Sequence, residues 1–360
     1  MTHGTLERYH RHTILKGFGA EGQEKLHTAR VLVVGAGGLG VPVLTYLNAM
    51  GVGTLGVVDH DVVQLSNLHR QVLYDEAQVG MPKVTAALEK LKAQNSNTRL
   101  VAHHCFLNTE NVMDILSDYD LVVDASDNFP TRYLINDACV LQRKPFVYGA
   151  LHGFEGQVSV FNHKNGPTYR CLFPQMPKAE EVPNCNEHGV LGILPGIIGN
   201  LQALEAIKII TGVGEVLSGT LLIYDALDQR IQRIQVPLDH KNLKITALAK
   251  AYALSCGQDE EQISVQGLMK LLDDEGAYLV DVRSTTEYAT GHIPGSNNIP
   301  LPELMERLAE VRLDAPVYVI CQSGVRSAAA VDQLKEQLPL GRYINVIGGM
   351  NQYSDHANSR

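Results

Sequence analysis

The sequence predicts an α/β protein with two domains, and three observations support this prediction. The chain has 360 residues, and a domain takes roughly 150 residues, so more than one hydrophobic core is expected. In the first part of the chain, short β-branched runs alternate with segments of helical periodicity, which is typical of a parallel sheet with crossover helices. After a polar stretch, a second pattern of this kind begins at Ile263 and continues to the end.

The composition excludes several classes of protein. Apolar residues make up 45% of the chain and charged residues 19%, a globular range that excludes a disordered, collagen-like or coiled-coil protein. The formal net charge of -9 argues against a surface that neutralises nucleic-acid phosphates or lies on anionic lipid. We therefore expect a protein or a small molecule as partner, and neither nucleic acid nor a membrane.

The location of the protein is predicted from its opening residues and its most apolar segment. Residues Met1 to Thr13 are polar, so no secretory signal is visible. The segment Val190 to Ile210 is interrupted by polar residues and predicts a core helix rather than a membrane span. We expect a cytoplasmic location, where scattered cysteines form no disulfide framework and each is judged for chemistry or burial. The six cysteines are Cys105, Cys139, Cys171, Cys185, Cys256 and Cys321.

The elements of the first domain follow from its apolar periodicity. Up to about Ala150 they indicate a doubly wound sheet; the expected strands are Val31 to Val34, Thr54 to Val58, Leu121 to Val123 and Phe146 to Tyr148, and the expected helices are Leu39 to Met50 and the segment that Pro82 opens. The next elements are strands at Gln157 to Phe161, Leu221 to Tyr224 and Ile231 to Val236, with a helix at Ile197 to Ile210. The predicted domains are 1–238 and 262–360, joined by a linker at 239–261 that is partly helical at Ile245 to Leu254.

A glycine-rich segment opens the first predicted helix. Gly35-Ala-Gly-Gly-Leu-Gly40 follows a strand, the context in which backbone N–H groups and the helix dipole hold a phosphate. Asp59 stands at the end of the second strand, where a carboxylate can accept hydrogen bonds from ribose hydroxyls. By themselves these two features favour a nicotinamide dehydrogenase.

The residues after Asp59 resemble the ATP site of the MoeB/ThiF family, which is related to ubiquitin-activating enzymes. The resemblance covers roughly residues 6 to 236 and implies a Rossmann-like adenylation domain with a mixed sheet. It is carried by the run Asp59 to Gln71, by Pro82-Lys83, by Asp124 to Asn128 with Arg132, and by Arg8 to His12, Gly17-Phe18 and Gly22-Gln23 near the start.

The family resemblance assigns roles to individual residues. It implies that Gly38 and Asp59 hold the nucleotide, that Asp127 helps to hold Mg²⁺, and that Arg11 corresponds to an arginine that family dimers insert into the neighbouring subunit's site. A homodimer is therefore expected. Asn67, Arg70, Gln71 and Lys83 would surround the phosphates, and the further nucleotide-binding residues are Asp61, Ser66 and Asn128.

Adenylation chemistry explains why so many charged residues gather there. A carboxylate that attacks the α-phosphate meets a strongly anionic centre, so several cations and a metal are needed to spread the developing charge. A hydride-transfer site needs no such set. Arg70 or Lys83 alone would fit a solvated surface charge, but the ordered set favours an ATP site.

Cys185 precedes the glycine-rich helix start at Gly189 to Gly192. The same position in thiamine-type family members carries a cysteine that bonds to the sulfur-carrier protein, so the resemblance implies a covalent role. The thiolate would be favoured by His188 and the following helix start. The structural alternative is a small buried hydrophobic residue.

The family commonly binds structural zinc through two C-x-x-C pairs, and this sequence departs from that pattern. The two segments read Thr168-Tyr-Arg-Cys171 and Ala253-Leu-Ser-Cys256. Two thiolates cannot close a four-ligand site. We therefore expect no zinc, and packing around Thr168 in its place.

The C-terminal residues resemble a rhodanese domain over its full length. The resemblance is carried by Leu279 to Arg283, Glu287-Tyr288, Gly291 to Gly295 and Cys321 to Ser327. Cys321 follows an apolar strand, so successive backbone N–H groups of the loop can point at its sulfur and stabilise a thiolate or persulfide. The predicted persulfide loop is Cys321, Gln322, Ser323, Gly324, Val325 and Arg326.

Arg326 is expected to add a fixed positive charge that keeps the Cys321 sulfur nucleophilic. A cysteine and an arginine on one loop also fit a phosphatase, but four residues separate them here and phosphatase relatives have five. Sulfur transfer is therefore favoured. His292, Asp281 and Arg283 are expected to be structural, and Cys105 and Cys139 to be buried and inert.

Together the two domains predict an adenylyltransferase fused to a sulfurtransferase, similar to MoeB-rhodanese and Uba-type fusions. With ATP and Mg²⁺ it would adenylate the C-terminal glycine of a ubiquitin-like sulfur-carrier protein that ends in Gly-Gly. A persulfide on Cys321, loaded by a cysteine desulfurase, would then give a thiocarboxylate. The alternatives are a rhodanese domain that only docks a partner, a nicotinamide oxidoreductase, and a ligase-type enzyme with a lasting Cys185 thioester.

Overall fold

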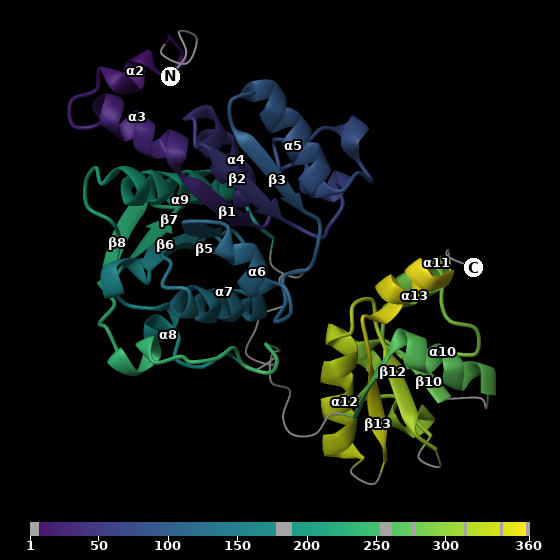
Figure 1. The fold of residues 1–360 in the computed structure, drawn as a ribbon. Helices are drawn as coiled ribbons and strands as arrows, with labels where there is room; N and C mark the ends of the chain where they lie inside the picture. The colour runs from purple at the N-terminus through teal and green to yellow at the C-terminus, as the bar shows by residue number, and fades with distance from the viewer. Residues whose placement is uncertain are drawn as a thin grey trace. The chain divides into compact units, whose positions relative to one another are not determined.

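The computed structural model describes residues 7–177, 189–252, 261–274, 278–312, 315–338 and 341–357. The described residues from Glu7 to Met176 and from Gly189 to Tyr252 form one compact unit, and those from Glu261 to Ala357 form a second (Figure 1). Cys185, His188 and Cys256 lie outside the described residues.

The first unit is built on an eight-stranded mixed sheet with the strand order β3-β2-β1-β4-β5-β6-β7-β8. The strands from β3 to β5 pair in parallel, and those from β5 to β8 are antiparallel. The strands are β1 (Arg30–Val34), β2 (Thr54–Val58), β3 (Arg99–His103), β4 (Leu121–Asp124), β5 (Phe146–His152), β6 (Glu155–Phe161), β7 (Thr220–Asp225) and β8 (Arg230–Gln235).

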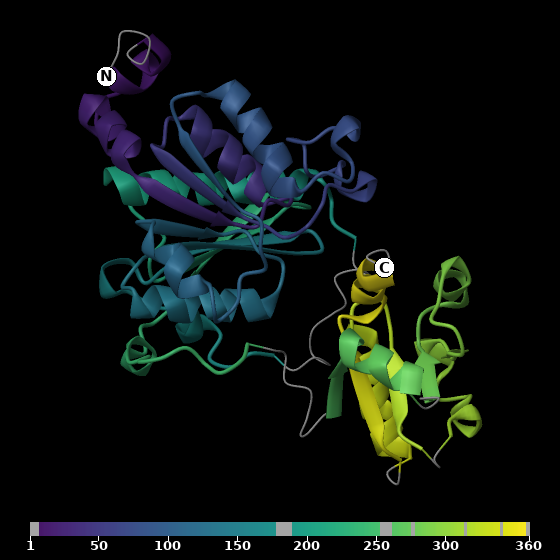
Figure 2. The ribbon, with the colours of Figure 1, turned by 45° about the vertical axis from the view of Figure 1, so that its right-hand side comes forward.

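Helices cover both faces of this sheet (Figure 2). They are α2 (His10–Thr13), α3 (Gly19–Thr28), α4 (Gly40–Ala49), α5 (Lys83–Gln94), α6 (Val112–Ser117), α7 (Phe129–Leu141), α8 (Tyr169–Leu172) and α9 (Ile193–Thr211). Since successive strand residues point to opposite faces, the apolar run of β1 serves two cores. Val31 and Val33 belong to one hydrophobic cluster and Leu32 to the other.

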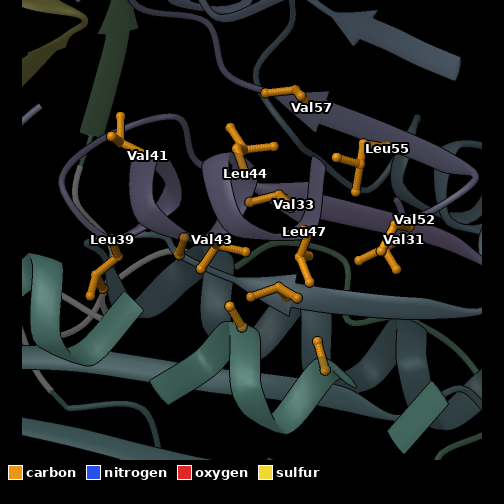
Figure 3. Close-up of a cluster of buried hydrophobic side chains, with 14 of the residues drawn as sticks. Val31, Val33, Leu39, Val41, Val43, Leu44, Leu47, Val52, Leu55 and Val57 are labelled. Carbon is orange, nitrogen blue, oxygen red and sulfur yellow. The ribbon is translucent and has the colours of Figure 1, made fainter. Parts of the chain in front are cut away.

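The first of these clusters lies between the sheet and helices α4 and α9. In Figure 3 the α4 side chains Leu44 and Leu47 lie beside Val31 and Val33 of β1. Among the described residues, α9 is the one helix long and apolar enough to cross a membrane, with a mean hydropathy of 1.4 over its best window. Half of that window is buried, and α9 packs against α4, β5 and β6, so it is a core helix, as the sequence predicts.

The second unit has a five-stranded parallel sheet with the order β11-β10-β12-β13-β9. One hydrophobic cluster joins Val280 and Val319 to Leu334 of α12, and another joins Leu279 and Val346 to Leu268 of α10. The elements are β9 (Glu261–Ser264), α10 (Val265–Asp274), β10 (Tyr278–Asp281), α11 (Thr285–Thr290), β11 (Asn297–Asn298), β12 (Val317–Ile320), α12 (Val325–Gln337), β13 (Tyr343–Ile347) and α13 (Gly349–Ala357).

The observed architecture confirms the predicted class, a mixed α/β sheet followed by a second α/β unit. One detail is wrong: residues 245–252, within the segment expected to be helical, form no helix, and the short helix of this region is the 3-10 turn η5 (His240–Leu243). The four-residue spacing of Leu248 and Tyr252 suggests a helix, but both side chains pack against the first unit. The predicted linker is therefore bound to that unit as far as Tyr252.

Candidate functional site

The strand order of the first unit reverses beside β1. The chain runs from β1 to β2 and β3 on one side and then crosses to β4 on the other side. In sheets of this type, ligands bind beyond the carboxyl ends of the strands at the point where the order reverses. Gly35 follows β1 there, Asp59 follows β2 and Ala125 follows β4.

The glycine segment after β1 is tightly folded against its neighbours. Gly35 has a φ of 101°, and a Cβ atom on it would lie 2.6 Å from the Ala125 carbonyl oxygen. A Cβ atom on Gly40, where α4 begins, would overlap the Gly35 carbonyl oxygen. These two glycines are therefore required for the backbone to turn from β1 into α4 at this distance.

Two of the predicted phosphate-binding side chains meet this glycine segment. A Cβ atom on Gly37 would lie 3.6 Å from Nε2 of Gln71, and one on Gly38 would lie 3.6 Å from Cδ of Arg70. Residues more than 30 positions apart in the sequence are thus brought together at the start of α4. The positive end of a helix dipole lies in the same place.

Asp59 is held just beyond the end of β2 by the main chain. Its Oδ2 atom accepts a hydrogen bond from Ala36 N at 2.7 Å, and its Oδ1 atom accepts one from Asp61 N at 2.8 Å. The side chain stays partly exposed. Its orientation is therefore fixed, while lone pairs of both oxygens are left for a ribose hydroxyl.

Lys83 is almost completely buried and pairs with Asp61. Its Nζ atom lies 2.7 Å from Asp61 Oδ2, and its main-chain N–H donates to the Asp61 carbonyl oxygen at 2.9 Å. The Lys83 side chain is 6% exposed and the Asp61 side chain 53% exposed. The carboxylate compensates for the water that the ammonium group loses on burial.

The other predicted phosphate ligands lie in η1 (Leu65–Asn67) and in the residues that follow it. Gln71 donates from Nε2 to Asn67 Oδ1 at 3.2 Å, and Asn67 donates to Ser66 Oγ at 3.3 Å. Arg70 donates to the Ser66 carbonyl oxygen at 3.2 Å and lies against His69. The buried Oε1 atom of Gln71 has no hydrogen-bond partner among the described residues.

The loop after β4 carries Asp127 and Asn128. Asp127 is exposed and accepts a hydrogen bond from Asn128 Nδ2 at 3.3 Å. Asn128 caps α7, because its Oδ1 atom accepts from Thr131 N at 2.9 Å. The exposed carboxylate at the sheet edge is an oxygen donor of the kind that Mg²⁺ prefers.

Asp124, for which the sequence predicts no role of its own, organises this loop from below. It is fully buried, and its Oδ1 atom accepts from Ser126 N at 3.0 Å and from Ser126 Oγ at 2.6 Å. Burial raises the pKa of the Asp124 carboxyl, against the opposing charge of Arg132. The Arg132 guanidinium donates to the Ser126 carbonyl oxygen at 3.2 Å. The position of Asp124 as the last residue of a buried strand is the sequence signal that could have identified this role.

The remaining predicted residues of the first unit lie at separate places. Arg11 is exposed on α2, next to the exposed apolar side chains of Ile14 and Leu15. Cys139 is fully buried and Cys105 partly buried, and burial raises the pKa of both thiols. Within the described part of the chain, one group of potential metal ligands is close enough to share an ion: Asp59, His60 and Asp61.

Cys171, at the position where the family commonly has a zinc ligand, accepts several hydrogen bonds. Its sulfur accepts from Thr168 N and Asp239 N, both at 3.4 Å, and from Asn242 Nδ2 at 3.5 Å. Burial alone would raise the pKa of the Cys171 thiol, but the donors of Asn242, Thr168 and Asp239 together lower it. Cys256, the second cysteine of that prediction, lies outside the described residues, so the absence of zinc stays a prediction.

Cys321 is fully buried at the turn from β12 into α12. Its sulfur accepts hydrogen bonds from Gly324 N at 3.1 Å and from Ser327 Oγ at 3.4 Å. Gly324 has a φ of 96°, a conformation that lets its N–H point back at the sulfur. Of the other loop residues, Gln322 is partly exposed, and Ser323 and Val325 are exposed.

Arg326 interacts electrostatically with Cys321 and also pairs with a carboxylate that the sequence does not indicate. Its two terminal nitrogens lie 2.8 Å and 2.6 Å from the two carboxylate oxygens of Glu287 on α11. The hydrogen bonds from Arg326 lower the pKa of Glu287 to about 2. The guanidinium fork is thus occupied by Glu287, while Gly324 and Ser327 donate to the sulfur.

Further side chains fix the position of this loop. Arg283 binds Asp281 through both carboxylate oxygens and also donates to Gln322 Oε1 at 3.2 Å. The His292 ring stacks on Tyr288 and hydrogen-bonds to the Tyr288 carbonyl oxygen. These contacts are structural, as the sequence suggests for Asp281, Arg283 and His292.

Fold and site together define a two-unit α/β protein, with a glycine-rich turn of nucleotide-binding type in one unit and a buried cysteine at a strand-to-helix turn in the other. The ThiF family model matches residues 9–245, and the rhodanese-like domain model matches residues 264–356. The chain belongs to the ThiF family and carries a C-terminal rhodanese-like domain.

Curated relatives match either the whole chain or its first part. The adenylyltransferase and sulfurtransferase MOCS3-2 of Zea mays is 41% identical over 380 residues, which cover 97% of this chain and 79% of the relative. The sulfur carrier protein adenylyltransferase of Thermus thermophilus is 55% identical over 236 residues, which cover 64% of this chain and 87% of the relative.

Solved structures share the fold at low sequence identity. A crystal structure of E. coli MccB with MccA-N7isoASN superposes with a TM-score of 0.58 and 21% identity, covering 65% of this chain and 73% of that chain. At this identity the likeness establishes the fold of the first unit.

Proposed function

We propose that this protein uses ATP to adenylate the C-terminal glycine of a ubiquitin-like sulfur-carrier protein and then converts the adenylate into a thiocarboxylate. The observation that carries the proposal is that Arg70 and Gln71 reach the glycine segment at the start of α4, in a chain that also holds the sulfur of Cys321 at a helix start. The relatives named above support both halves, since their names describe adenylyltransferase and sulfurtransferase activities.

The first step joins the carrier carboxylate to AMP. A carboxylate oxygen attacks the α-phosphorus, a new P–O bond forms, and the bond to the bridging oxygen breaks as diphosphate leaves. Arg70 and Lys83 would stabilise the charge that develops on the phosphates, and Asp59 would orient the ribose. Asp61, Ser66, Asn67, Gln71, Gly38 and Asn128 complete the proposed site.

The donor set also suits a magnesium ion. Asp127 presents an exposed carboxylate at the edge of the sheet, and Mg²⁺ is usually held by one or two carboxylates together with substrate phosphates. When bound, the ion would neutralise phosphate charge. Arg11, exposed on α2, would act in the nucleotide site of the second subunit of a homodimer.

The second step replaces AMP by sulfur. The outer sulfur of a Cys321 persulfide attacks the acyl carbon, a C–S bond forms, and the C–O bond to AMP breaks. Two electrons from a dithiol reductant then cleave the S–S bond and release the thiocarboxylate and the Cys321 thiolate. In a variant of this order, Cys185 attacks the adenylate first. The persulfide comes from a protein cysteine persulfide, such as that of a cysteine desulfurase.

Isotope exchange and mass spectrometry test the two halves separately. With ATP, Mg²⁺ and a carrier ending in Gly-Gly, labelled pyrophosphate should enter ATP. Cys321→Ala should keep this exchange and abolish thiocarboxylate formation. If no such carrier supports the exchange, the adenylation step is wrong; if Cys321→Ala still forms thiocarboxylate at the full rate, the rhodanese-like domain only docks a partner.

A further inference from the structure

Ser327 occupies a position at Cys321 for which the sequence provides no role. It lies in the first turn of α12 and is fully buried. Its hydroxyl group donates to the Cys321 sulfur at 3.4 Å. The one other donor to that sulfur among the described residues is the Gly324 main-chain N–H at 3.1 Å.

The cation expected to stabilise the sulfur makes its hydrogen bonds to a carboxylate. Both terminal nitrogens of Arg326 bind Glu287, and the Glu287 carboxylate is itself fixed by hydrogen bonds from Ser284 N and Ser284 Oγ at 3.0 and 2.9 Å. The nearby Arg283 charge is likewise matched by Asp281. Both guanidinium groups are thus paired with a carboxylate. Arg326 still interacts electrostatically with Cys321, but the groups that contact the sulfur directly, among the described residues, are the hydrogen-bond donors of Gly324 and Ser327.

We propose that Ser327 is a catalytic residue of the sulfur-transfer half, whose hydroxyl stabilises the Cys321 thiolate. This inference deepens the proposed function at the same sulfur. A hydrogen bond donated to the charged form of a group favours that form, and hydrogen bonds to charged acceptors are the stronger ones. Because Ser327 and Cys321 are both buried, water does not compete for the bond.

The same bond serves both directions of sulfur transfer. During loading, the Sγ atom attacks the outer sulfur of a donor protein's cysteine persulfide; the new S–S bond forms, and the electron pair of the old one leaves with the donor thiolate. During release, cleavage of the Cys321 S–S bond returns an electron pair to Sγ. A more stable thiolate is formed faster as leaving group, and the Ser327 hydroxyl supplies that stabilisation.

Alkylation of Cys321 in the full-length protein tests the role of Ser327. Iodoacetamide is uncharged, so Arg326 and Glu287 do not steer it, and peptide mass spectrometry follows Cys321 separately from the other cysteines. In Ser327→Ala the alkylation profile should move to higher pH, with a rate at neutral pH about tenfold lower than in the wild type. Thiocarboxylate formation should fall by about the same factor.

The pH profile separates this role from a structural one. A change in access to the buried sulfur alters the rate at every pH, whereas loss of the hydroxyl displaces the profile along the pH axis. Ser296→Ala is the matched control: Ser296 is also buried, but its hydroxyl donates to the Ile293 carbonyl oxygen at 2.7 Å. This control should keep the wild-type profile.

Three outcomes decide the matter. A displaced profile in Ser327→Ala alone supports the proposal. A Ser327→Ala profile that coincides with that of the wild type overturns it, as does a displacement in Arg326→Gln without one in Ser327→Ala. Alkylation needs no ATP, carrier or sulfur donor, so a failure of the adenylation proposal leaves this test intact. Alanine is a good helix former, and unaltered thermal unfolding will show that the variant is folded.

Discussion

The Nζ atom of Lys83 lies 2.7 Å from the Asp61 carboxylate, and the lysine side chain is buried while the aspartate is exposed. The lysine is thus oriented by a carboxylate at the surface. The ammonium group is therefore already in position when a phosphate group binds. The entropy cost of ordering the Lys83 side chain has been met in folding and does not oppose binding.

Lys83→Ala should reduce pyrophosphate exchange by roughly 10²- to 10³-fold, the usual effect of removing one group that stabilises transition-state charge. Asp61→Asn should have a smaller effect, because it leaves the ammonium group present but less well held. We expect it mainly in the KM for ATP. Steady-state exchange kinetics of both variants separate the effect on kcat from the effect on the KM for ATP. Equal losses of kcat in the two variants would show that Asp61 has a further role.

Gly40→Ala should abolish nucleotide binding, because its Cβ atom would overlap the Gly35 carbonyl oxygen and force the glycine segment apart. Gly196→Ala in α9 is the matched control, since a Cβ atom there meets no atom within 4 Å. The control should keep exchange and gain about 0.5–1 kcal/mol of helix stability. Thermal unfolding and ATP titration of both variants check this; normal ATP binding by Gly40→Ala would contradict it.

Asp124 should set the position of the loop that carries Asp127. Asp124→Ala removes the acceptor of both Ser126 hydrogen bonds. Pyrophosphate exchange should fall by roughly 5- to 30-fold, which corresponds to a loss of about 1–2 kcal/mol for the two bonds. Asp124→Asn keeps an oxygen acceptor and should retain most of the exchange. Similar losses in both variants would mean that the charge of the carboxylate is what matters.

The raised pKa of Asp124 also predicts a pH dependence of stability. A carboxyl with a raised folded-state pKa stabilises the fold below its ordinary pKa, and this contribution is lost as pH rises through the folded-state value. The melting temperature of the wild type relative to Asp124→Asn should therefore decrease between pH 4 and pH 8. Differential scanning calorimetry over this range provides the measurement.

The Glu287–Arg326 pair predicts the opposite pH dependence in the second unit. The pKa of Glu287 is lowered from 4.5 to about 2, so the pair stabilises the fold fully above pH 4.5 and loses that contribution as pH falls toward 2. Relative to Glu287→Gln, the wild type should have a constant advantage in melting temperature at pH 5–8 that shrinks in acid. An advantage that is unchanged in acid would show that Glu287 acts through packing.

Cys171 should hold the segment from Asp239 to Tyr252 on the first unit. Cys171→Ala removes the acceptor of the Asp239 and Asn242 hydrogen bonds, and limited proteolysis should cut this segment faster. A zinc chelator should leave both the wild-type cleavage rate and the melting temperature unchanged. Stoichiometric zinc in the purified protein, measured by mass spectrometry, would contradict this arrangement.

The sequence predicts an element correctly where the local pattern of apolar residues and glycines is enough to determine its structure. The strand Thr54–Val58 and the turn from β12 to Cys321 follow directly from apolar runs next to glycines. The meeting of Arg70 with the glycine segment was implied by family resemblance and not by spacing, since it depends on how a long loop folds back.

Other features could not be predicted because they are settled by tertiary contacts. Glu287 and Arg326 are 39 residues apart, and nothing local indicates that the arginine also pairs with a carboxylate. Likewise, Leu248 and Tyr252 have helical spacing but pack in a non-helical segment, because burial against α7 and α8 overrides a weak propensity.

The contact of Tyr252 with Asp137 has a practical consequence for dividing the protein. Asp137 is buried and receives hydrogen bonds from the Tyr252 hydroxyl and from Arg170, each at 2.7 Å. A gene fragment that stops at residue 238, where the strands of the sheet are complete, would leave that carboxylate short of a donor and uncover the apolar patch beneath Leu248. A fragment that contains the first unit alone should therefore extend past Tyr252 in order to fold stably.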